Sequence, residues 1–207
     1  ETGGEALLQM LTVNHFINNL GIDGNRVSPL TVNDVKIACA INLQPISLKQ
    51  ALPQLRAKDA TLTELSFSEF DGNRAYNDEA TEILCYELRE NENIKVLDLC
   101  DNNIGAAGCR AIGDLIAHPS TKLEVLKLMG NDIGDDGAAA LAQAFTKTNT
   151  LVAVDLRSTN ITAAGVTAVA ESLTQNDSIT SVLISKADVP VEVTAHLSRE
   201  LAVNMQT

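Results

Sequence analysis

A unit of 28 or 29 residues recurs along the chain, and this repeat constrains the fold more than any other feature. Residues 123–150 and residues 151–178 each begin with apolar residues spaced three and two apart. Each then passes through a polar turn that leads to a Gly, and ends in an Ala-rich stretch. Residues 94–122 show the same arrangement. A period of this length indicates stacked supersecondary units that share one continuous core.

The repeat can be followed in both directions from this central part. Towards the C-terminus a further copy begins at Ile179, and towards the N-terminus one begins at Leu62, 32 residues before Ile94. Fainter copies can be traced around Ile37 and from Ile17. The sequence therefore predicts about seven repeats.

The two halves of each unit have different apolar periods. In residues 94–104, Leu97 and Leu99 are two apart, which is the spacing of side chains on one face of a strand. Further on, Ile112, Leu115 and their neighbours recur at three and four, as on one face of a helix. Each unit is predicted to be a short strand followed by a helix that packs antiparallel to it. Neighbouring helices pack roughly 10 Å apart, whereas neighbouring strands lie about 4.8 Å apart, so the stack should bend with its strands on the concave face.

The pattern L-x-x-L-x-L-x-x-N-x-I is carried in one unit by Leu123, Leu126, Leu128, Asn131 and Ile133. This pattern resembles that of leucine-rich repeats. The unit length of 28–29 residues and the Ala- and Leu-rich second half are similar to the ribonuclease-inhibitor type. The resemblance implies an α/β leucine-rich-repeat solenoid, or horseshoe, of about seven repeats, with a parallel β-sheet on the concave face and helices on the convex face.

We expect residues 1–207 to form a single leucine-rich-repeat domain. Within it, residues 1–33 are predicted to be an irregular N-terminal cap, residues 34–189 the repeats, and residues 190–207 a C-terminal capping helix. The tail keeps helical spacing, and its polar residues suit a terminal unit that has one face in water.

Polar residues mark the point where each predicted strand ends. The amides of Asn102 and Asn131 can satisfy backbone groups that the turn exposes. Thr159 occupies this position in the next unit and can make one such bond, whereas Ala187 can make none. We therefore expect a looser turn near residue 187.

The unit over residues 62–93 is about four residues longer than the others. The extra residues follow the strand and should bulge at the rim between strand and helix. They include Tyr76, one of two tyrosines in the chain. An exposed Tyr on a rim loop could serve as a contact residue, although an insertion without a function is the simpler interpretation.

Residues that alternate with the buried strand residues should line the concave face. An apolar centre around Val96, Val125 and Met129 would lie between charged residues, as in many protein-contact surfaces. Alternatively, Lys127 pairs with Asp98 and Asp155 across neighbouring strands, worth a few tenths of a kcal/mol each. The predicted partner-binding residues are Glu64, Ser66, Tyr76, Val96, Asp98, Cys100, Lys127, Met129, Asp155 and Arg157.

The sequence carries no catalytic or metal-binding motif. Its three histidines are far apart, and no Cys/His cluster has zinc-site spacing. Residues 131–137 resemble part of a calcium loop, but Gln143 stands where the closing Glu should be. Asp135 or Asp136 is better explained by a position near a helix N-terminus, where a carboxylate suits exposed N–H groups. We expect no enzyme activity, no catalytic residue, no cofactor and no metal.

Composition narrows the partners and the compartment. A net charge of −12 argues against nucleic acid and weakly favours a basic protein partner. The chain lacks a run of 18 apolar residues, so no membrane span is expected. Four cysteines without a C-x-x-C pair do not suggest a disulfide framework, which favours a cytoplasmic location. The sequons at Asn160 and Asn176 keep a secreted or cell-surface location as the alternative.

These observations favour a protein–protein interaction module, a scaffold or recognition domain, that binds a protein through its concave strand face. The chain standing alone and the chain being one domain of a larger protein are both open. The resemblance leaves three alternatives. The repeats are similar to those of Ran GTPase-activating proteins, for which Arg26 and Arg74 are the candidate rim arginines. They are also similar to actin-capping, tropomodulin-like repeat domains. An extracellular receptor domain is the third alternative.

Overall fold

The computed structural model describes residues 46–68, 76–185 and 189–206. Contacts within the chain divide it into two units, Glu1–Ala51 and Leu52–Thr207. The boundary lies inside helix α3 (Ile46–Arg56). The second unit contains the sheet and the candidate site, and each statement below concerns that unit.

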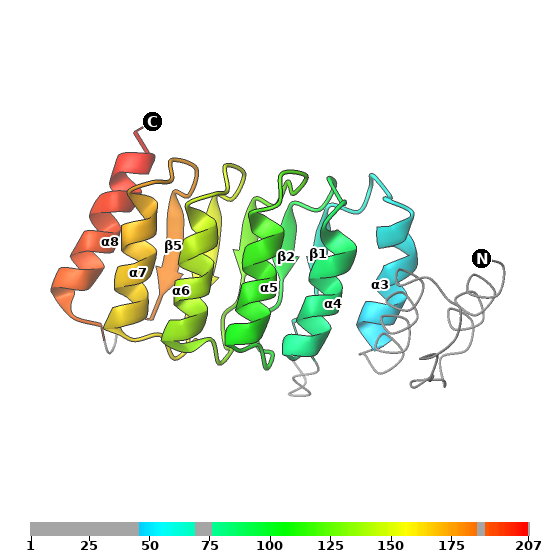
Figure 1. The fold of residues 1–207 in the computed structure, drawn as a ribbon, viewed down its shortest axis with the longest axis horizontal. Coiled ribbons are helices and arrows are strands. Elements are labelled where there is room, and N and C mark those ends of the chain that lie inside the picture. Colours follow the sequence, from blue (N-terminus) through cyan, green and yellow to red (C-terminus); the bar gives the residue numbers. More distant parts are fainter. Residues whose placement is uncertain (1–45, 69–75, 186–188, 207) are drawn as a thin grey trace, which may run out of the picture. The chain divides into compact units, whose positions relative to one another are not determined.

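Strands and helices alternate through the second unit, and Figure 1 shows the helices in a layer on one side of the strands. The strands are β1 (Glu64–Ser66), β2 (Val96–Asp98), β3 (Val125–Lys127), β4 (Ala153–Leu156) and β5 (Ser181–Ile184). The helices that follow them are α4 (Asp78–Leu88), α5 (Ala106–Ile116), α6 (Gly134–Phe145), α7 (Ala163–Leu173) and α8 (Val191–Asn204). All five strands form one parallel sheet in sequence order, which confirms the predicted α/β solenoid. No helix among the described residues is long and apolar enough to cross a membrane.

The strand register is the one that the repeat alignment predicts. Asp98 lies opposite Ser66 on β1 and opposite Lys127 on β3, and Lys127 lies opposite Asp155 on β4. Equivalent residues of successive repeats therefore form rows across the sheet. The alternate row, which includes Leu126, points to the helices and is buried. The core of this unit consequently lies between the sheet and the helix layer.

The strand-end asparagines hold each repeat to the one before it. Asn131 is buried, and its amide donates hydrogen bonds to the C=O of Leu128 (2.9 Å) and of Leu99 in the preceding repeat (2.8 Å). Its Oδ1 accepts a hydrogen bond from the N–H of Ile104 (3.0 Å). Asn102 makes equivalent bonds one repeat earlier. The predicted structural role of these asparagines is confirmed.

Thr159 takes the place of Asn in the next repeat and makes fewer bonds. Its hydroxyl donates one hydrogen bond, 2.6 Å long, to the C=O of Leu156. This is the single bond that its side chain was expected to make. Ala187, where a looser turn is predicted, lies outside the described residues.

A carboxylate from one repeat caps the helix of the next. Asp135 lies in the first turn of α6, as expected, but its hydrogen bonds reach α7. It accepts from the N–H groups of Thr162 (2.8 Å) and Gly165 (3.0 Å), and from the Thr162 hydroxyl (2.7 Å). Asp78 makes the same two backbone bonds to the start of α5. A Cβ at Gly165 would lie 2.6 Å from Asp135 Oδ1, so this close approach explains the Gly in the repeat pattern.

The turn from helix to strand is held by a second set of buried polar side chains, which the sequence analysis missed. Asn176 is buried and donates hydrogen bonds to the C=O of Phe145 and of Thr148, both 2.8 Å long. Its Oδ1 accepts from the N–H groups of Ser178 (3.0 Å) and Ile179 (2.8 Å). A glycan on Asn176 would have to occupy this buried position, so the second sequon is a structural element of the fold.

Tyr76 is not on the surface, and its predicted exposure is wrong. Its relative exposure is 0%, and its ring lies 4.7 Å from that of Phe67. The reason is local, because Asn77 is the N-cap of α4 and accepts a hydrogen bond from Ala80 N–H (3.0 Å). An apolar residue just before an N-cap commonly packs down onto the first turn of its helix. The rest of the predicted rim bulge, residues 69–75, lies outside the described residues.

The described cysteines, Cys85, Cys100 and Cys109, are free and buried. Burial raises the pKa of both the Cys100 and the Cys109 thiols to about 12. These side chains are therefore neutral thiols at physiological pH and pack as small apolar groups. Cys39 lies outside the described residues.

Candidate functional site

The strand face of the sheet contains a hollow of about 400 Å³. Residues of β2 to β5 line it, together with residues that follow β2, β3 and β4 and with Ser68 after β1. Val125 and Ala153 lie opposite each other in one row across the strands. Met129 contributes from the end of β3 and Leu183 from β5. These four apolar side chains lie among charged residues, as the sequence predicts for a contact surface.

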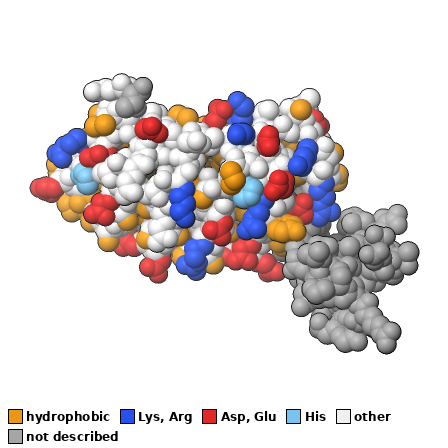
Figure 2. Space-filling model, turned by 45° about the horizontal axis from the view of Figure 1, so that its top comes forward, with side chains coloured by type: hydrophobic (Ala, Val, Ile, Leu, Met, Phe, Trp, Pro, Cys, Tyr) orange, Lys and Arg blue, Asp and Glu red, His pale blue; other side chains and the backbone are white. Residues whose placement is uncertain are grey.

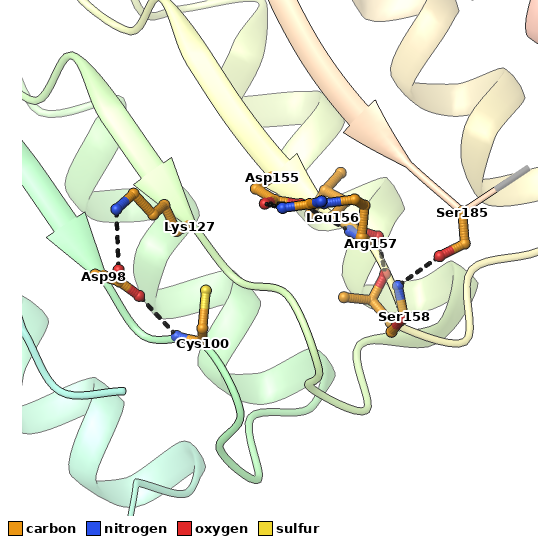
Figure 3. Close-up of polar contacts among 9 residues, drawn as sticks. Asp98, Cys100, Lys127, Asp155, Leu156, Arg157, Ser158 and Ser185 are labelled. Carbon is orange, nitrogen blue, oxygen red and sulfur yellow. Dashed lines mark hydrogen bonds and ion pairs between the residues drawn. The ribbon is translucent and has the colours of Figure 1, made fainter. Parts of the chain in front are cut away.

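The first charged pair joins β2 and β3. Lys127 Nζ lies 3.0 Å from Asp98 Oδ2, and Asp98 Oδ1 accepts a hydrogen bond from Cys100 N–H (3.1 Å) (Figure 3). Burial raises the pKa of the Asp98 carboxyl, but the hydrogen bonds from Cys100 and Lys127 outweigh burial and hold this pKa below its ordinary value. Asp98 is therefore a carboxylate at neutral pH, and each of its oxygens accepts a hydrogen bond.

The second charged pair forms within one strand end. Arg157 Nε and Nη2 donate to the Asp155 carboxylate at 2.9 Å and 2.5 Å, and Arg157 N–H donates to its Oδ1 at 3.1 Å (Figure 3). This arrangement raises the pKa of the Arg157 guanidinium through hydrogen bonding to Asp155. The expected pair of Asp155 with Lys127 is replaced by the shorter-range pair with Arg157. The expected pair of Lys127 with Asp98 is present.

Asp98 and Asp155 share a local role that the sequence analysis missed. Each occupies the same position of its repeat, and each accepts a hydrogen bond from the backbone N–H two residues later. Asp side chains commonly stabilise a turn in this way. The signal was present in the segments LDLC and VDLR, where Asp recurs at one position of the pattern. The two carboxylates thus shape the turns beside the hollow as well as pairing with cations.

The structure brings most of the predicted site residues together. The predicted residues that line the hollow are Asp98, Cys100, Lys127, Met129, Asp155 and Arg157. Glu64, Ser66 and Val96 belong to β1 and β2 but are outside its lining, and Tyr76 is in the core. Cys100 and Asp155 are only 7% and 8% exposed, so they offer a partner little surface.

Ala153 and Leu183 are among the lining residues that were absent from the predicted set. Both follow the same alternation along β4 and β5 that identified the other strand-face residues. Leu183 is 46% exposed, which is unusual for a large apolar side chain on a sheet. The alternation along β5 predicted Leu183 on the strand face, but the predicted partner-binding set left it out.

The net charge of −12 does not produce a uniformly acidic surface. Figure 2 shows Lys and Arg side chains interspersed with Asp and Glu on the face in view. Within the described ranges, no group of three or more His, Cys, Asp and Glu residues is arranged to hold a metal ion.

Comparison with known proteins agrees with the repeat analysis. Three stretches, residues 90–113, 120–142 and 147–170, match the sequence profile of a family described as Leucine Rich repeat. Human protein NLRC5 is 37% identical over 78 residues, which is 38% of this chain and 4% of NLRC5. The matched stretches span 4% to 16% of the length of the curated relatives.

Two solved structures share the fold. One is leiomodin-1 Actin-Binding Site 2, with a TM-score of 0.67 and 17% identity, over 78% of this chain and 91% of the other. The second is the tropomodulin C-terminal domain of Caenorhabditis elegans, with a TM-score of 0.65 and 19% identity, over 77% of this chain and 93% of the other. At this level of identity the likeness concerns the arrangement of strands and helices.

Proposed function

Because this chain is a leucine-rich repeat protein, we propose that it is an interaction module that binds a protein partner through the strand face of its sheet. The proposal concerns this stretch of sequence, since the curated relatives are far longer than their matched segments. A role in binding without catalysis is part of the proposal.

The observation that carries this proposal is the hollow on the strand face. It combines apolar side chains from three neighbouring strands with two ion pairs, and its residues come from successive repeats held in register. A rigid sheet that presents an apolar centre among charged groups has the composition of a protein interface. The matched stretches of Leucine Rich repeat sequence include β2, β3 and β4, which form most of this surface.

The test is a comparison of captured partners between charge-altered variants. The double variant Met129→Glu, Arg157→Glu places two carboxylates at the hollow and should abolish capture of the partner from native extract. Arg110→Glu on the exposed face of α5 is the matched control, because it also reverses an exposed arginine but lies outside the lining of the hollow. It should leave capture unchanged.

Circular dichroism and urea unfolding must first show that both variants fold as the wild type does. Loss of one captured protein in the double variant alone would support binding at the strand face. Capture that survives the double variant, or that is lost in Arg110→Glu, would contradict it and would point to the helical face.

Actin is a second candidate partner, because one structural neighbour is described as an actin-binding site. The likeness at 17% identity is one of fold, so the experiment must decide. Co-sedimentation with actin filaments should show binding that is lost in the Met129→Glu, Arg157→Glu double variant if the strand face holds actin. Absence of co-sedimentation with the wild type would remove this candidate.

The GTPase-activating alternative keeps its candidates Arg26 and Arg74 as predictions, since both lie outside the described residues. A receptor domain that depended on a glycan at Asn176 would conflict with the burial of that side chain. The cytoplasmic location and the predicted domain boundaries also stay predictions.

A further inference from the structure

We propose that the partner fills the hollow with an uncharged segment that carries an aromatic side chain, so that apolar contact rather than charge provides the affinity. This inference rests on the proposed function, namely binding of a protein at the strand face. The net charge suggested a basic partner, whereas this inference assigns the hollow an uncharged, apolar segment of the partner.

The charges in the middle of the hollow are already neutralised by one another. The Asp98 and Asp155 side chains are only 14% and 11% exposed, and each accepts hydrogen bonds from its own cation and from a backbone N–H. Lys127 and Arg157 are 39% and 49% exposed, but each is bound to its carboxylate. A charged group placed between these pairs would have to break one of them or lose its own hydration, because both acids and both cations are already paired.

One further carboxylate, that of Asp101, also lines the hollow, but it lies past the end of β2 at the rim. It lies outside the row that Val125 and Ala153 form across the strands. Among the described residues, no cation in the lining is left over for an acidic partner, because Lys127 and Arg157 are both paired. An uncharged occupant keeps all of these contacts intact.

The apolar part of the hollow has the chemistry of an aromatic subsite. Val125 and Ala153 form its floor, Leu183 is 46% exposed at β5, and Met129 adds a thioether. Sulfur atoms make favourable contacts with aromatic rings, and buried aromatic anchors dominate the energy of many interfaces. None of the described residues that line the hollow is aromatic, so the ring would come from the partner.

The size of the hollow also fits this occupant. A volume of about 400 Å³ lies near the lower end of the range for sites that bury small ligands, so one side chain with its neighbouring backbone would fill it. Its lining comes from four strands, so the inserted ring would touch several repeats at once. The partner would bind as a short segment with one dominant anchor.

The experiment selects random peptides of about 12 residues, displayed on phage, against the wild-type protein. Selection against the Ala153→Gln variant runs in parallel, because the larger polar side chain occupies the centre of the hollow. Peptides that enrich on the wild type alone should share an aromatic residue flanked by uncharged residues. Their dissociation constants should change by no more than about twofold between about 0.05 and 0.5 M NaCl, since screening acts on charges and not on apolar contact.

A matched pair of variants tests the anchor site directly. Leu183→Ser should raise the dissociation constants of the selected peptides roughly tenfold, as loss of a central apolar contact does. Val152→Ser is the control, because Val152 is similarly exposed at 42% but does not line the hollow. It should leave binding unchanged. Leu183 is exposed, so its replacement keeps the test valid even if Ala153→Gln does not fold.

The outcomes separate this inference from the proposed function. The inference would be overturned if the peptides specific for the wild type shared a charged residue and lost about tenfold or more of their affinity in salt. Binding at the strand face would still stand in that case. The inference and the proposed function would both be overturned if the same peptides enriched equally on the wild type and on Ala153→Gln, or if no peptide enriched. Equal loss of affinity in Leu183→Ser and Val152→Ser would also overturn both.

Discussion

Replacement of Asn131 by Ala tests whether the strand-end asparagines hold the repeats together. The Asn131 side chain makes three hydrogen bonds, with the C=O of Leu99 and Leu128 and with the N–H of Ile104. In Asn131→Ala, the C=O of Leu99 would keep its bond from Asn102, at 3.2 Å. The loss therefore falls on the Leu128 C=O and the Ile104 N–H.

The expected cost follows from these two groups. A buried backbone group left without its partner costs about 1 to 3 kcal/mol, so the free energy of unfolding should fall by roughly 3 kcal/mol. Thr159→Ala is the matched control, because that side chain makes a single strand-end bond, to Leu156 C=O. Its loss should cost about 1 kcal/mol.

Equilibrium urea unfolding, followed by far-UV circular dichroism and by a second probe of tertiary structure, measures both costs. Two probes are needed because repeat arrays can unfold one part at a time. If Asn131→Ala costs no more than Thr159→Ala, the hydrogen-bond count at the strand end does not set stability, and the reasoning is refuted. An Asn131→Asp variant should also be strongly destabilised, since its carboxylate would face the Leu128 carbonyl.

Three further changes test other parts of the fold. Asp135→Asn should lower the free energy of unfolding by about 1 kcal/mol at neutral pH. Hydrogen bonding from Thr162 holds the pKa of the Asp135 carboxyl below its ordinary value, so the cap is complete above that ordinary value and is lost as the pH falls through the lowered pKa. Urea unfolding across pH should therefore show a smaller loss of stability in acid for the variant than for the wild type. Tyr76→Ala should cost about 3 to 5 kcal/mol in the same assay, whereas Tyr86→Ala, at 47% exposure, should cost far less; equal costs would contradict the burial of Tyr76. If the chain is expressed in a glycosylating host, peptide mass mapping should find Asn176 unmodified in the folded protein, and a glycan there would contradict its buried hydrogen bonds.

The strand-face surface was largely predictable, because it depends on local alternation. Once one repeat was aligned, every second residue of each strand fell in a row, and the observed pairing of Asp98 with Lys127 followed from that register. The pairing of Asp155 was predicted wrongly. Its neighbour along the strand end, Arg157, donates to both carboxylate oxygens, whereas Lys127 is bound to Asp98. Competition between two cations for two acids is not visible in a repeat pattern.

The sequence by itself determined the strand-and-helix unit, the parallel order of the strands and the role of Asn131, because periods of two and of three to four, and a polar residue at a strand end, are local properties. The tertiary structure alone decided contacts that the alternation along a strand does not fix. Asp135 caps a helix that begins 28 residues later, and Tyr76 packs into the core. These outcomes depend on how closely neighbouring repeats stack, and that distance is set by side-chain packing between residues far apart in the sequence.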